Sequence, residues 1–428
     1  NPEVFPVVVV CPASLKWNWE REAAIHFSWR AEVLGGTKPK RTAIPSHSRL
    51  IILNYDVLGP WIPYLLDLNP GLLVIDEIHY TSGRTTARAK NMIKLADKIP
   101  RVIGLSGTPM INRPSDMWAP LRIVAPKLFP SFFTFAHRYC SPKRTWYGWD
   151  FSGASHLEEL NQKIQPIMSR LRKIDVLPEL PEQQNTIVLL DLTDRTEYEK
   201  VRDEYLSCVG SDKPSLLRGE EKNKAKGSLF RLKHLVAQLK LPASYDWFDQ
   251  FLASTDEKLI AFGIHRKSVV EALHERYAKQ SSVITGAVSG KARQEAWDRF
   301  LRDPKCRLCS GNIDACGVGL SARGVSTTAF LELPWTPAKL TQAQARTHGI
   351  GRGEAGKVSQ SYFLIARNTI ESRLLQILQR KQKHATVVLD GGQAEDNFDL
   401  YDELTEMLKE EKEARGYNNE GIAHFGLR

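Results

Sequence analysis

Two adjacent acids and a histidine follow a short apolar run in residues 72–79. Residues 72–75 have the continuous apolar character of a strand that is buried on both faces of a parallel sheet. Asp76, Glu77 and His79 would then lie at the carboxyl end of that strand, where open α/β sheets bind their ligands. One carboxylate there can hold Mg²⁺ through water, and its neighbour can orient an attacking water. The alternative is a strand end with ordinary solvated charges.

The elements that must position these side chains alternate between strand and helix patterns. Strands are predicted at 7–11, 49–56, 72–75 and 101–105, with a helix at 87–98. A second series begins near Lys258, with strands predicted at 259–262, 282–284, 307–309, 329–331 and 361–365 and helices at 268–280 and 291–301. Because strands that alternate with helices form parallel sheets covered by helices, the fold class is α/β with two parallel-sheet lobes.

The segment between the two series has a different character. Aromatic residues cluster from Phe129 to Phe151, and a basic helix is predicted at 167–174. We interpret the cluster as the small core of a helical insertion, with stacking on nucleobases as the less favoured alternative. Residues 194–241 are predicted to be helical and charged. The basic residues there form either a solvated helix face or a nucleic-acid contact surface; they are Lys222, Lys224, Lys226, Arg231, Lys233 and Lys240.

Four domains are expected: a first lobe at 1–125, helical insertions and a linker at 126–241, a second lobe at 242–389, and an acidic C-terminal tail at 390–428. The acidic part of the tail, residues 390–413, is expected to be a partly helical, solvated appendage. The less favoured alternative is an autoinhibitory contact with a basic face.

The composition indicates a globular intracellular protein with a polyanionic partner. The 428 residues have a net charge of +10, which favours a partner such as nucleic acid. The six cysteines are scattered, as in a reduced protein. Cys306 and Cys309 form a single C-x-x-C motif, and because a zinc ribbon needs a second one, we favour a core strand. No apolar run reaches the roughly 18 residues of a membrane span. We expect a location in a prokaryotic cytoplasm, a virus-infected cell or a nucleus, without secretion.

Several short blocks occur in the order of known helicase motifs and cover residues 7–382. The chain thereby resembles the Swi/Snf-type DNA translocases of helicase superfamily two, whose fold is two RecA-like lobes. The blocks are 11–15 (motif Ia), 76–79 (motif II), 106–109 (motif III), 317–320 (motif V) and 342–352 (motif VI). Stretches similar to the HepA-related, annealing-helicase branch are 113–130, 138–140, 149–153 and 175–181.

This resemblance implies an ATP and Mg²⁺ site and assigns roles within the first lobe. Asp76 would hold Mg²⁺ through water, and Glu77 would orient or deprotonate the attacking water. His79 would link the site to motif III. Ser106 and Thr108 of motif III would connect this lobe to its partner lobe and to DNA.

The resemblance also implies roles for residues of the second lobe. Gln342 and Arg346 would complete the ATP site, with Arg346 as the arginine finger. Gly317 and Gly319 would allow close approach of the backbone in motif V. Arg352 could replace the second arginine of motif VI, because that position is Gly349 here. Gln344 and Ala345 stand where the family has acids, so the rate and the coupling to DNA stay open.

A phosphate-binding loop of the form G-x-x-x-x-G-K-[ST] does not occur in the sequence. The nearest segment, 286–292, is one residue short and offers Ala292 where a hydroxyl is needed, so we reject it. The chain begins at Asn1-Pro2 without Met, and we expect a fragment whose loop lies upstream. We therefore expect this chain alone to be inactive in ATP hydrolysis.

The sequence favours an ATP-dependent double-stranded DNA translocase, with fork remodelling or strand annealing as its candidate reactions. Its expected partners are double-stranded or branched DNA, and no membrane. Two alternatives stay open at this point. An RNA helicase also carries D-E-x-H, although the spacing of residues 342–352 argues against it. A catalytically silent DNA-binding module would keep both lobes without turnover.

Overall fold

A computed structural model describes the chain except for residues 1, 40–43, 45–47, 111–112, 146–147, 172, 177–182, 211–213, 215–216, 218, 289, 317–321, 323, 348–357, 391–399 and 424–428. The chain divides into two compact units. The first contains residues 1–170 and 383–395, and the second contains residues 171–382 and 396–428.

The first unit contains a five-stranded parallel sheet of order β2-β3-β1-β4-β5. Its strands are β1 (Val7–Cys11), β2 (Ala31–Val33), β3 (Leu50–Asn54), β4 (Leu72–Asp76) and β5 (Val102–Leu105). All residues of β1 and β3 are buried, as expected for strands covered on both faces. The four predicted strands are confirmed, while β2 has only three residues and was missed.

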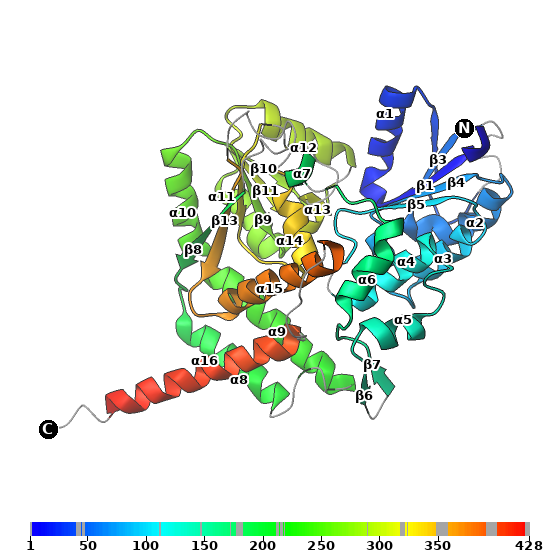
Figure 1. Ribbon diagram of the computed structural model, residues 1–428. Coiled ribbons are helices and arrows are strands. Elements are labelled where there is room, and N and C mark those ends of the chain that lie inside the picture. The colour runs from blue at the N-terminus through cyan, green and yellow to red at the C-terminus, as the bar shows by residue number, and fades with distance from the viewer. Residues whose placement is uncertain are drawn as a thin grey trace. The chain divides into compact units, whose positions relative to one another are not determined.

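Helices cover both faces of this sheet. Because its strands are all parallel, their carboxyl ends lie at the same end of the sheet. α1 (Lys16–Phe27) lies on one face, and α2 (Leu58–Leu66), α3 (Ala87–Ala96) and α4 (Trp118–Val124) lie on the other (Figure 1). Thr86 caps α3, since its side chain accepts a hydrogen bond from the backbone N–H of Ala89. The predicted helix at 87–98 is therefore confirmed.

The aromatic segment forms a small core of its own within the first unit. Phe129, Phe135 and Tyr139 are buried there with Leu160 and Ile164 of the following helix. The elements are α5 (Phe132–Tyr139), the antiparallel hairpin β6 (Lys143–Thr145) and β7 (Gly148–Asp150), and α6 (Leu157–Ile164). The insertion core predicted from the sequence is confirmed for this buried set.

The predicted basic helix at 167–174 is wrong. The chain forms a 3₁₀ turn at Gln165–Ile167 and the short α7 (Lys173–Val176), and residues 168–171 between them are not helical. Ile167 is 38% and Leu171 is 80% exposed, so the described residues of this basic stretch have no buried apolar stripe. Short helices without a packed face are marginal in water, which explains the outcome.

The second unit contains a six-stranded parallel sheet of order β10-β11-β9-β12-β13-β8. Its strands are β8 (Gln184–Leu190), β9 (Leu259–Gly263), β10 (Ser281–Ile284), β11 (Leu308–Asn312), β12 (Thr327–Phe330) and β13 (Gln360–Ala366). The five predicted strands are confirmed. β8 was missed because it is an exposed edge strand, and only Leu190 within it is buried.

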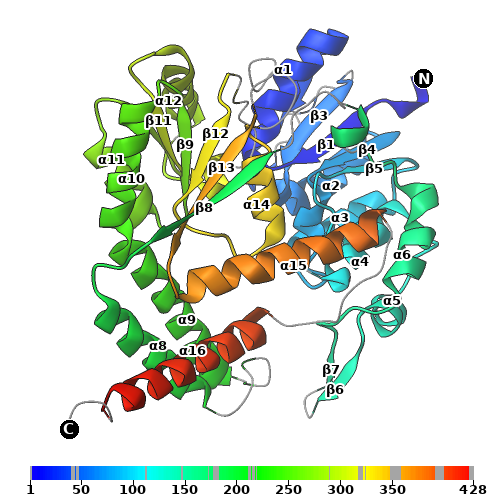
Figure 2. The same ribbon diagram turned by 60° about the vertical axis from the view of Figure 1, so that its left-hand side comes forward.

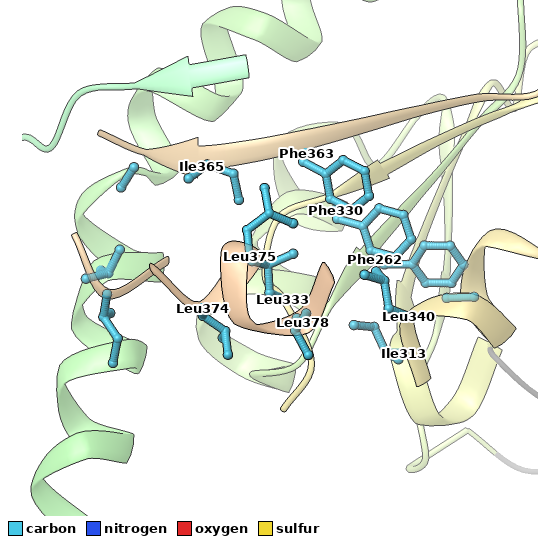
Figure 3. Close-up of a cluster of buried hydrophobic side chains, with 14 of the residues drawn as sticks. Phe262, Ile313, Phe330, Leu333, Leu340, Phe363, Ile365, Leu374, Leu375 and Leu378 are labelled. Carbon is cyan, nitrogen blue, oxygen red and sulfur yellow. The ribbon is translucent and has the colours of Figure 1, made fainter. Parts of the chain in front are cut away.

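The packing helices of the second unit are α8 (Arg195–Val209), α9 (Gly219–Leu239), α10 (Leu241–Ser254), α11 (Ala272–Arg276), α12 (Gly290–Arg302), α13 (Ile313–Cys316), α14 (Pro337–Gln344) and α15 (Ile370–Asp390). Phe262, Phe330 and Phe363 stack across three neighbouring strands at centroid distances of 5.2 and 5.1 Å. Leucines of α15 lie beside this row of rings (Figure 3). Cys306 and Cys309 are buried in the same core, which confirms the core interpretation of that pair.

The acidic tail is not a solvated appendage over its described helix, so that expectation is wrong. Leu400, Leu404 and Leu408 of α16 (Leu400–Ala423) are buried in the main core of the second unit. Glu411 is 3.4 Å from the buried Arg202 of α8. In both views α16 crosses α8 (Figures 1 and 2). Its apolar positions recur every four residues, so one face packs against the core, and Glu411 is buried on that side against Arg202.

None of the helices in the described parts of the chain has the length and apolar character needed to cross a membrane.

Candidate active site

The acidic pair predicted from the sequence lies at the carboxyl end of β4, between β1 and β5. Asp76 is the last residue of this strand, and Glu77 turns the chain with a φ of 53°. Non-glycine residues adopt positive φ at an energetic cost, so such a turn must be held by its surroundings. The Tyr55 hydroxyl donates to the backbone carbonyls of Asp76 at 2.7 Å and Glu77 at 3.2 Å. This tyrosine therefore fixes the direction in which both carboxylates leave the sheet.

One oxygen of the Asp76 carboxylate is held by a tryptophan. The Nε1–H of Trp19 in α1 donates to Asp76 Oδ2 at 2.8 Å. Burial raises the pKa of Asp76 above its ordinary value, and the Trp19 hydrogen bond opposes that rise by stabilising the charged form. The neighbouring Cys11 is also buried, and burial together with the Asp76 charge raises the pKa of its thiol to about 12. The thiol is therefore a neutral neighbour of the carboxylate at ordinary pH.

His79 joins the acidic pair to the end of the next strand. Its Nδ1 lies 2.9 Å from Ser106 Oγ and 3.1 Å from Glu77 Oε2. Ser106 Oγ also accepts a hydrogen bond from the backbone N–H of Thr108 at 3.1 Å. His79 of motif II is thus hydrogen-bonded to Ser106 of motif III and lies close to Glu77, although the roles of these residues stay predictions.

The donor set fits Mg²⁺ and a water nucleophile. Mg²⁺ keeps several waters and binds proteins through one or two carboxylates, as Asp76 at an open strand end can provide. Within the described ranges no group of three or more histidines, cysteines and acids forms a closed metal cage. Glu77 Oε2 is buried and has no aligned hydrogen bond with any described residue. Such an acceptor is suited to a water held close to the acidic pair.

The predicted residues of motif VI belong to the second unit. Gln342 lies near the end of α14, and Arg346 follows in a turn, where its backbone N–H donates to Ala343 O at 3.1 Å. Both side chains are half-buried. Gln344 Nε2 donates to Asn185 Oδ1 at 2.8 Å, so the residue that replaces an expected acid is used to hold α14 against β8. Gly317, Gly319, Gly349 and Arg352 lie outside the described residues.

The basic helix predicted at 194–241 separates into two kinds of lysine. On α9, Lys224 is exposed, Lys222 is half-buried, and Lys226 Nζ is 5.7 Å from the centre of the Tyr401 ring. Lys233 and Lys240 are each 1% exposed and therefore belong to no surface. For those two buried lysines, both the solvated-face and the nucleic-acid interpretations are wrong.

A second polar cluster, which the sequence did not single out, lies at the carboxyl ends of β9 and β12. The buried Glu332 accepts hydrogen bonds from the backbone of Ile264 and His265 and lies 2.5 Å from His265 Nδ1. The His265 ring stacks on His234 at 3.9 Å, and His234 Nε2 is 2.7 Å from Ser268 Oγ. Burial works against the charge of Glu332, yet these hydrogen bonds hold its pKa at about 2.

Trp19 and Tyr55 were also missed as site residues, because their contacts with Asp76 span 57 and 21 positions of the chain. The available signal was that Trp19 follows one predicted strand and Tyr55 lies near the end of another strand predicted for the same sheet. Strand ends of a parallel sheet meet at one edge, but this rule does not say which side chains turn inward.

Comparison with known proteins gives two consecutive domain matches, and the boundary between them lies within the second compact unit. Residues 2–236 match the SNF2-related domain, and residues 243–351 match the helicase conserved C-terminal domain. The chain is 29% identical over 411 residues to the mouse (Mus musculus) DNA annealing helicase and endonuclease ZRANB3, covering 91% of this chain and 37% of that protein. The chain is also 29% identical over 416 residues to the Xenopus laevis SWI/SNF-related matrix-associated actin-dependent regulator of chromatin subfamily A-like protein 1, covering 94% and 41%.

Among solved structures, the Sulfolobus solfataricus SWI2/SNF2 ATPase core in complex with dsDNA is similar with a TM-score of 0.39 and 22% identity, covering 91% of this chain and 83% of that one. The chain spans about two fifths of the length of the curated relatives named above. Since the match to residues 2–236 alone exceeds half of the 428 residues, this chain belongs to the SNF2-related family.

Proposed function

We propose that this chain supplies the two lobes of an ATP-dependent double-stranded DNA translocase. The observation that carries the proposal is that Asp76 and Glu77 lie at the carboxyl end of β4, with His79 3.1 Å from Glu77 and 2.9 Å from Ser106. Membership in the SNF2-related family and likeness to a DNA annealing helicase support it. Fork remodelling and strand annealing are the candidate reactions, because a relative bears the name of an annealing helicase.

The residues of the first unit divide the chemistry between them. Asp76 would hold Mg²⁺ through water, and Trp19 keeps that carboxylate oriented. Bound Mg²⁺ neutralises charge on the phosphates of ATP. Glu77 would orient the attacking water and accept its proton. His79 and Ser106 would transmit the state of this site to the loop after β5, which contains Thr108.

We further propose that hydrolysis needs a phosphate-binding loop supplied by a strand paired with β5. β5 is one of the two edge strands of the first sheet, and it leaves Ile103 47% and Leu105 39% exposed. An exposed apolar edge strand is a template for a further strand. A parallel strand paired there would end at the same edge as Asp76, so the loop after it would point toward the acidic pair. Without such a loop, we expect no turnover by the 428 residues.

Residues of the second unit would serve the transition state and the DNA. Gln342 would contact the nucleotide, and Arg346 would neutralise charge that develops on the γ-phosphate, with Arg352 as the alternative finger. On α9, Lys222, Lys224 and Lys226 would contact DNA phosphates. Such contacts release counterions, so binding would weaken steeply with salt and would not depend on base sequence.

The test uses this chain joined at its N-terminus to the phosphate-binding-loop segment of an SNF2-family relative, called here the loop-bearing chimera. The chimera should hydrolyse ATP when duplex DNA is added, and the chain alone should not. Glu77→Gln in the chimera should keep ATP binding and lose hydrolysis by about three orders of magnitude or more, because the water loses its base. Arg346→Ala should also lower turnover with little loss of ATP affinity, as expected for a contact made in the transition state.

The control is Glu158→Gln, the same change at an exposed residue of α6. This variant should hydrolyse ATP like the unmodified chimera. Stimulation by RNA but not by DNA would replace the proposal with an RNA helicase. A chimera that binds ATP and DNA without any turnover would replace it with a silent DNA-binding module.

A further inference from the structure

The aromatic segment of the first unit has an exposed half that its small core does not explain. Phe129, Phe135 and Tyr139 are only 2–3% exposed within that core. Phe133 of α5 and Trp149 of β7 are 54% and 49% exposed. Hydrophobic burial explains the three core rings, but Phe133 and Trp149 keep large apolar rings exposed to water. Gathered exposed apolar groups of this kind mark binding surfaces more often than isolated ones do.

The exposed rings are held in place by one another. Trp149 stacks on Phe151 with centroids 6.4 Å apart and planes 22° apart. The His137 ring lies edge-on to Trp149 at 4.7 Å and to Phe151 at 5.4 Å, and Phe133 contacts Phe151 at 6.1 Å. We name these four residues, Phe133, His137, Trp149 and Phe151, the aromatic platform. Its rings are already ordered, so a ligand that stacks on them loses little side-chain entropy from the protein.

The platform lies at the base of a projecting hairpin. In both views, β6 and β7 extend from α5 away from the sheet of the first unit (Figures 1 and 2). Arg144 of β6 pairs with Trp149 of β7 in the antiparallel register. Directly opposite residues share one face of such a pair, so a guanidinium and an indole lie on the same face of the hairpin.

Two arginines beside the platform have no carboxylate partner among the described residues. The guanidinium of Arg84 lies 4.3 Å from the centre of the Phe132 ring and 5.5 Å from that of Phe133. In the described part of the chain, Arg84 and Arg144 form no ion pair with a carboxylate, whereas Arg138 on the same helix as Phe133 is paired with Glu159. Lys143 lies opposite Asp150 in the hairpin register and therefore on the other face. A polyanion would complement Arg84 and Arg144.

We propose that the aromatic platform binds unpaired nucleobases of single-stranded DNA, with Arg84 and Arg144 holding the adjacent phosphates. Rings with open faces beside cations are the elements of single-strand recognition. A duplex covers the faces of its bases, so this surface selects the unpaired segment of a fork or branch. A protein partner is the weaker alternative, since charged groups are depleted at the centres of protein interfaces. The inference rests on the proposed function only in taking DNA as the substrate.

The test measures the binding of the 428-residue chain to three labelled probes by fluorescence anisotropy. The probes are a blunt duplex, a single strand, and a single strand of equal length whose bases are replaced by abasic sites. The unmodified chain should bind the base-bearing strand more tightly than the abasic strand, since only the first can stack. Trp149→Ala should weaken binding to the base-bearing strand by about ten-fold and leave binding to the abasic strand and the duplex unchanged.

Matched variants separate stacking from charge and from folding. Trp149→Phe should restore most of the affinity, because a ring is present again. Trp17→Ala removes an indole that is 64% exposed on α1 and should change nothing. Arg144→Ala should weaken binding to both single-stranded probes equally. It should also reduce the slope of log affinity against log salt concentration by about one, as expected when one phosphate contact is lost.

The outcomes distinguish this inference from the proposed function. If the unmodified chain binds none of the probes, the proposed function fails as well. If the duplex is bound but Trp149→Ala leaves the difference between the two single strands intact, the platform proposal is wrong and the proposed function stands. If Trp149→Ala instead abolishes self-association seen in sedimentation, with DNA binding unaltered, the surface is a contact between copies of this chain and the proposal is also wrong.

Discussion

Trp19 Nε1 lies 2.8 Å from Asp76 Oδ2 and donates a hydrogen bond to it. The bond joins the helix after β1 to the end of β4, so one carboxylate oxygen is fixed before any ligand arrives. A carboxylate that binds a cation through water must keep its other oxygen at a defined position. The tryptophan therefore acts as a positioning residue for Asp76.

Trp19→Phe in the loop-bearing chimera should raise the Mg²⁺ concentration needed for half-maximal ATP hydrolysis by about ten-fold. The estimate follows from the roughly 1.5–3 kcal/mol of a hydrogen bond to a charged group. The measurement is a Mg²⁺ titration of turnover at saturating ATP. Trp61→Phe is the control, because Trp61 Nε1 donates to the backbone oxygen of Gly36 and not to a carboxylate. Equal Mg²⁺ requirements for the two variants would contradict the positioning role.

The sequence predicted the buried strands well because strands covered on both faces are continuous apolar runs. Val7–Cys11 and Leu72–Asp76 gave this signal directly. β8 did not, since it is an exposed edge strand whose partner, β13, lies far along the chain. Pairing of that kind depends on tertiary structure and leaves no local pattern.

Side-chain partners were predicted only where a motif implied them. The resemblance led to the expectation that His79 links to motif III, and His79 contacts Ser106. Burial of Lys233 and Lys240 was not predicted, because lysines in a helix are normally solvated. Their amines are satisfied by the Leu333 and Leu364 carbonyls, groups 100 and 124 positions away. Burial of a charge thus depends on partners that the fold brings together.

The unpaired side of the edge strand β5 gives a prediction that distinguishes an effect on the stability of this chain from an effect on pairing with an added strand. Ile103→Arg should change the free energy of unfolding of this chain by no more than about 0.5 kcal/mol, as for other exposed positions. In the loop-bearing chimera, the same change should lower ATP hydrolysis strongly, because the paired strand would bury an unpaired charge. Ile25→Arg on α1, which is 63% exposed, is the control and should leave turnover intact. Unaltered turnover with Ile103→Arg would place the added strand elsewhere.

The buried pair of Lys240 and Glu371 should behave non-additively. Lys240 Nζ lies 2.7 and 2.6 Å from the two Glu371 oxygens, and both residues are at most 1% exposed. Glu371→Leu alone should lower the free energy of unfolding of the second unit by about 3–5 kcal/mol, since it leaves a buried cation unpaired. Lys240→Met combined with Glu371→Leu should cost less than that single change. Urea denaturation measures both, and a larger loss in the double variant would show that the pair itself stabilises the fold.

Two histidines of the second unit predict how its stability depends on pH. Burial lowers the pKa of His274 below its ordinary value of 6.5, with Arg299 acting in the same direction and Glu275 against it. Burial, and then His265, lowers the pKa of His234 in the same way. The His274 ring makes a hydrogen bond of 2.7 Å with Ser281, which holds the ring in the fold.

The sign of the effect follows from which state binds the proton. Below pH 6.5 the unfolded chain protonates these imidazoles and the folded chain does not, so the free energy of unfolding should fall as the pH decreases until the lowered folded pKa is reached. Glu332 acts in a separate window, because its stabilisation is present above pH 4.5 and is lost toward its pKa of about 2. In the His274→Gln variant, the urea midpoint of unfolding should therefore change less with pH between about pH 7 and 5 than it does in the unmodified chain. His26→Gln, at an exposed position of α1, should leave the slope unaltered. If both variants keep the slope of the unmodified chain, protonation of His274 does not contribute to it.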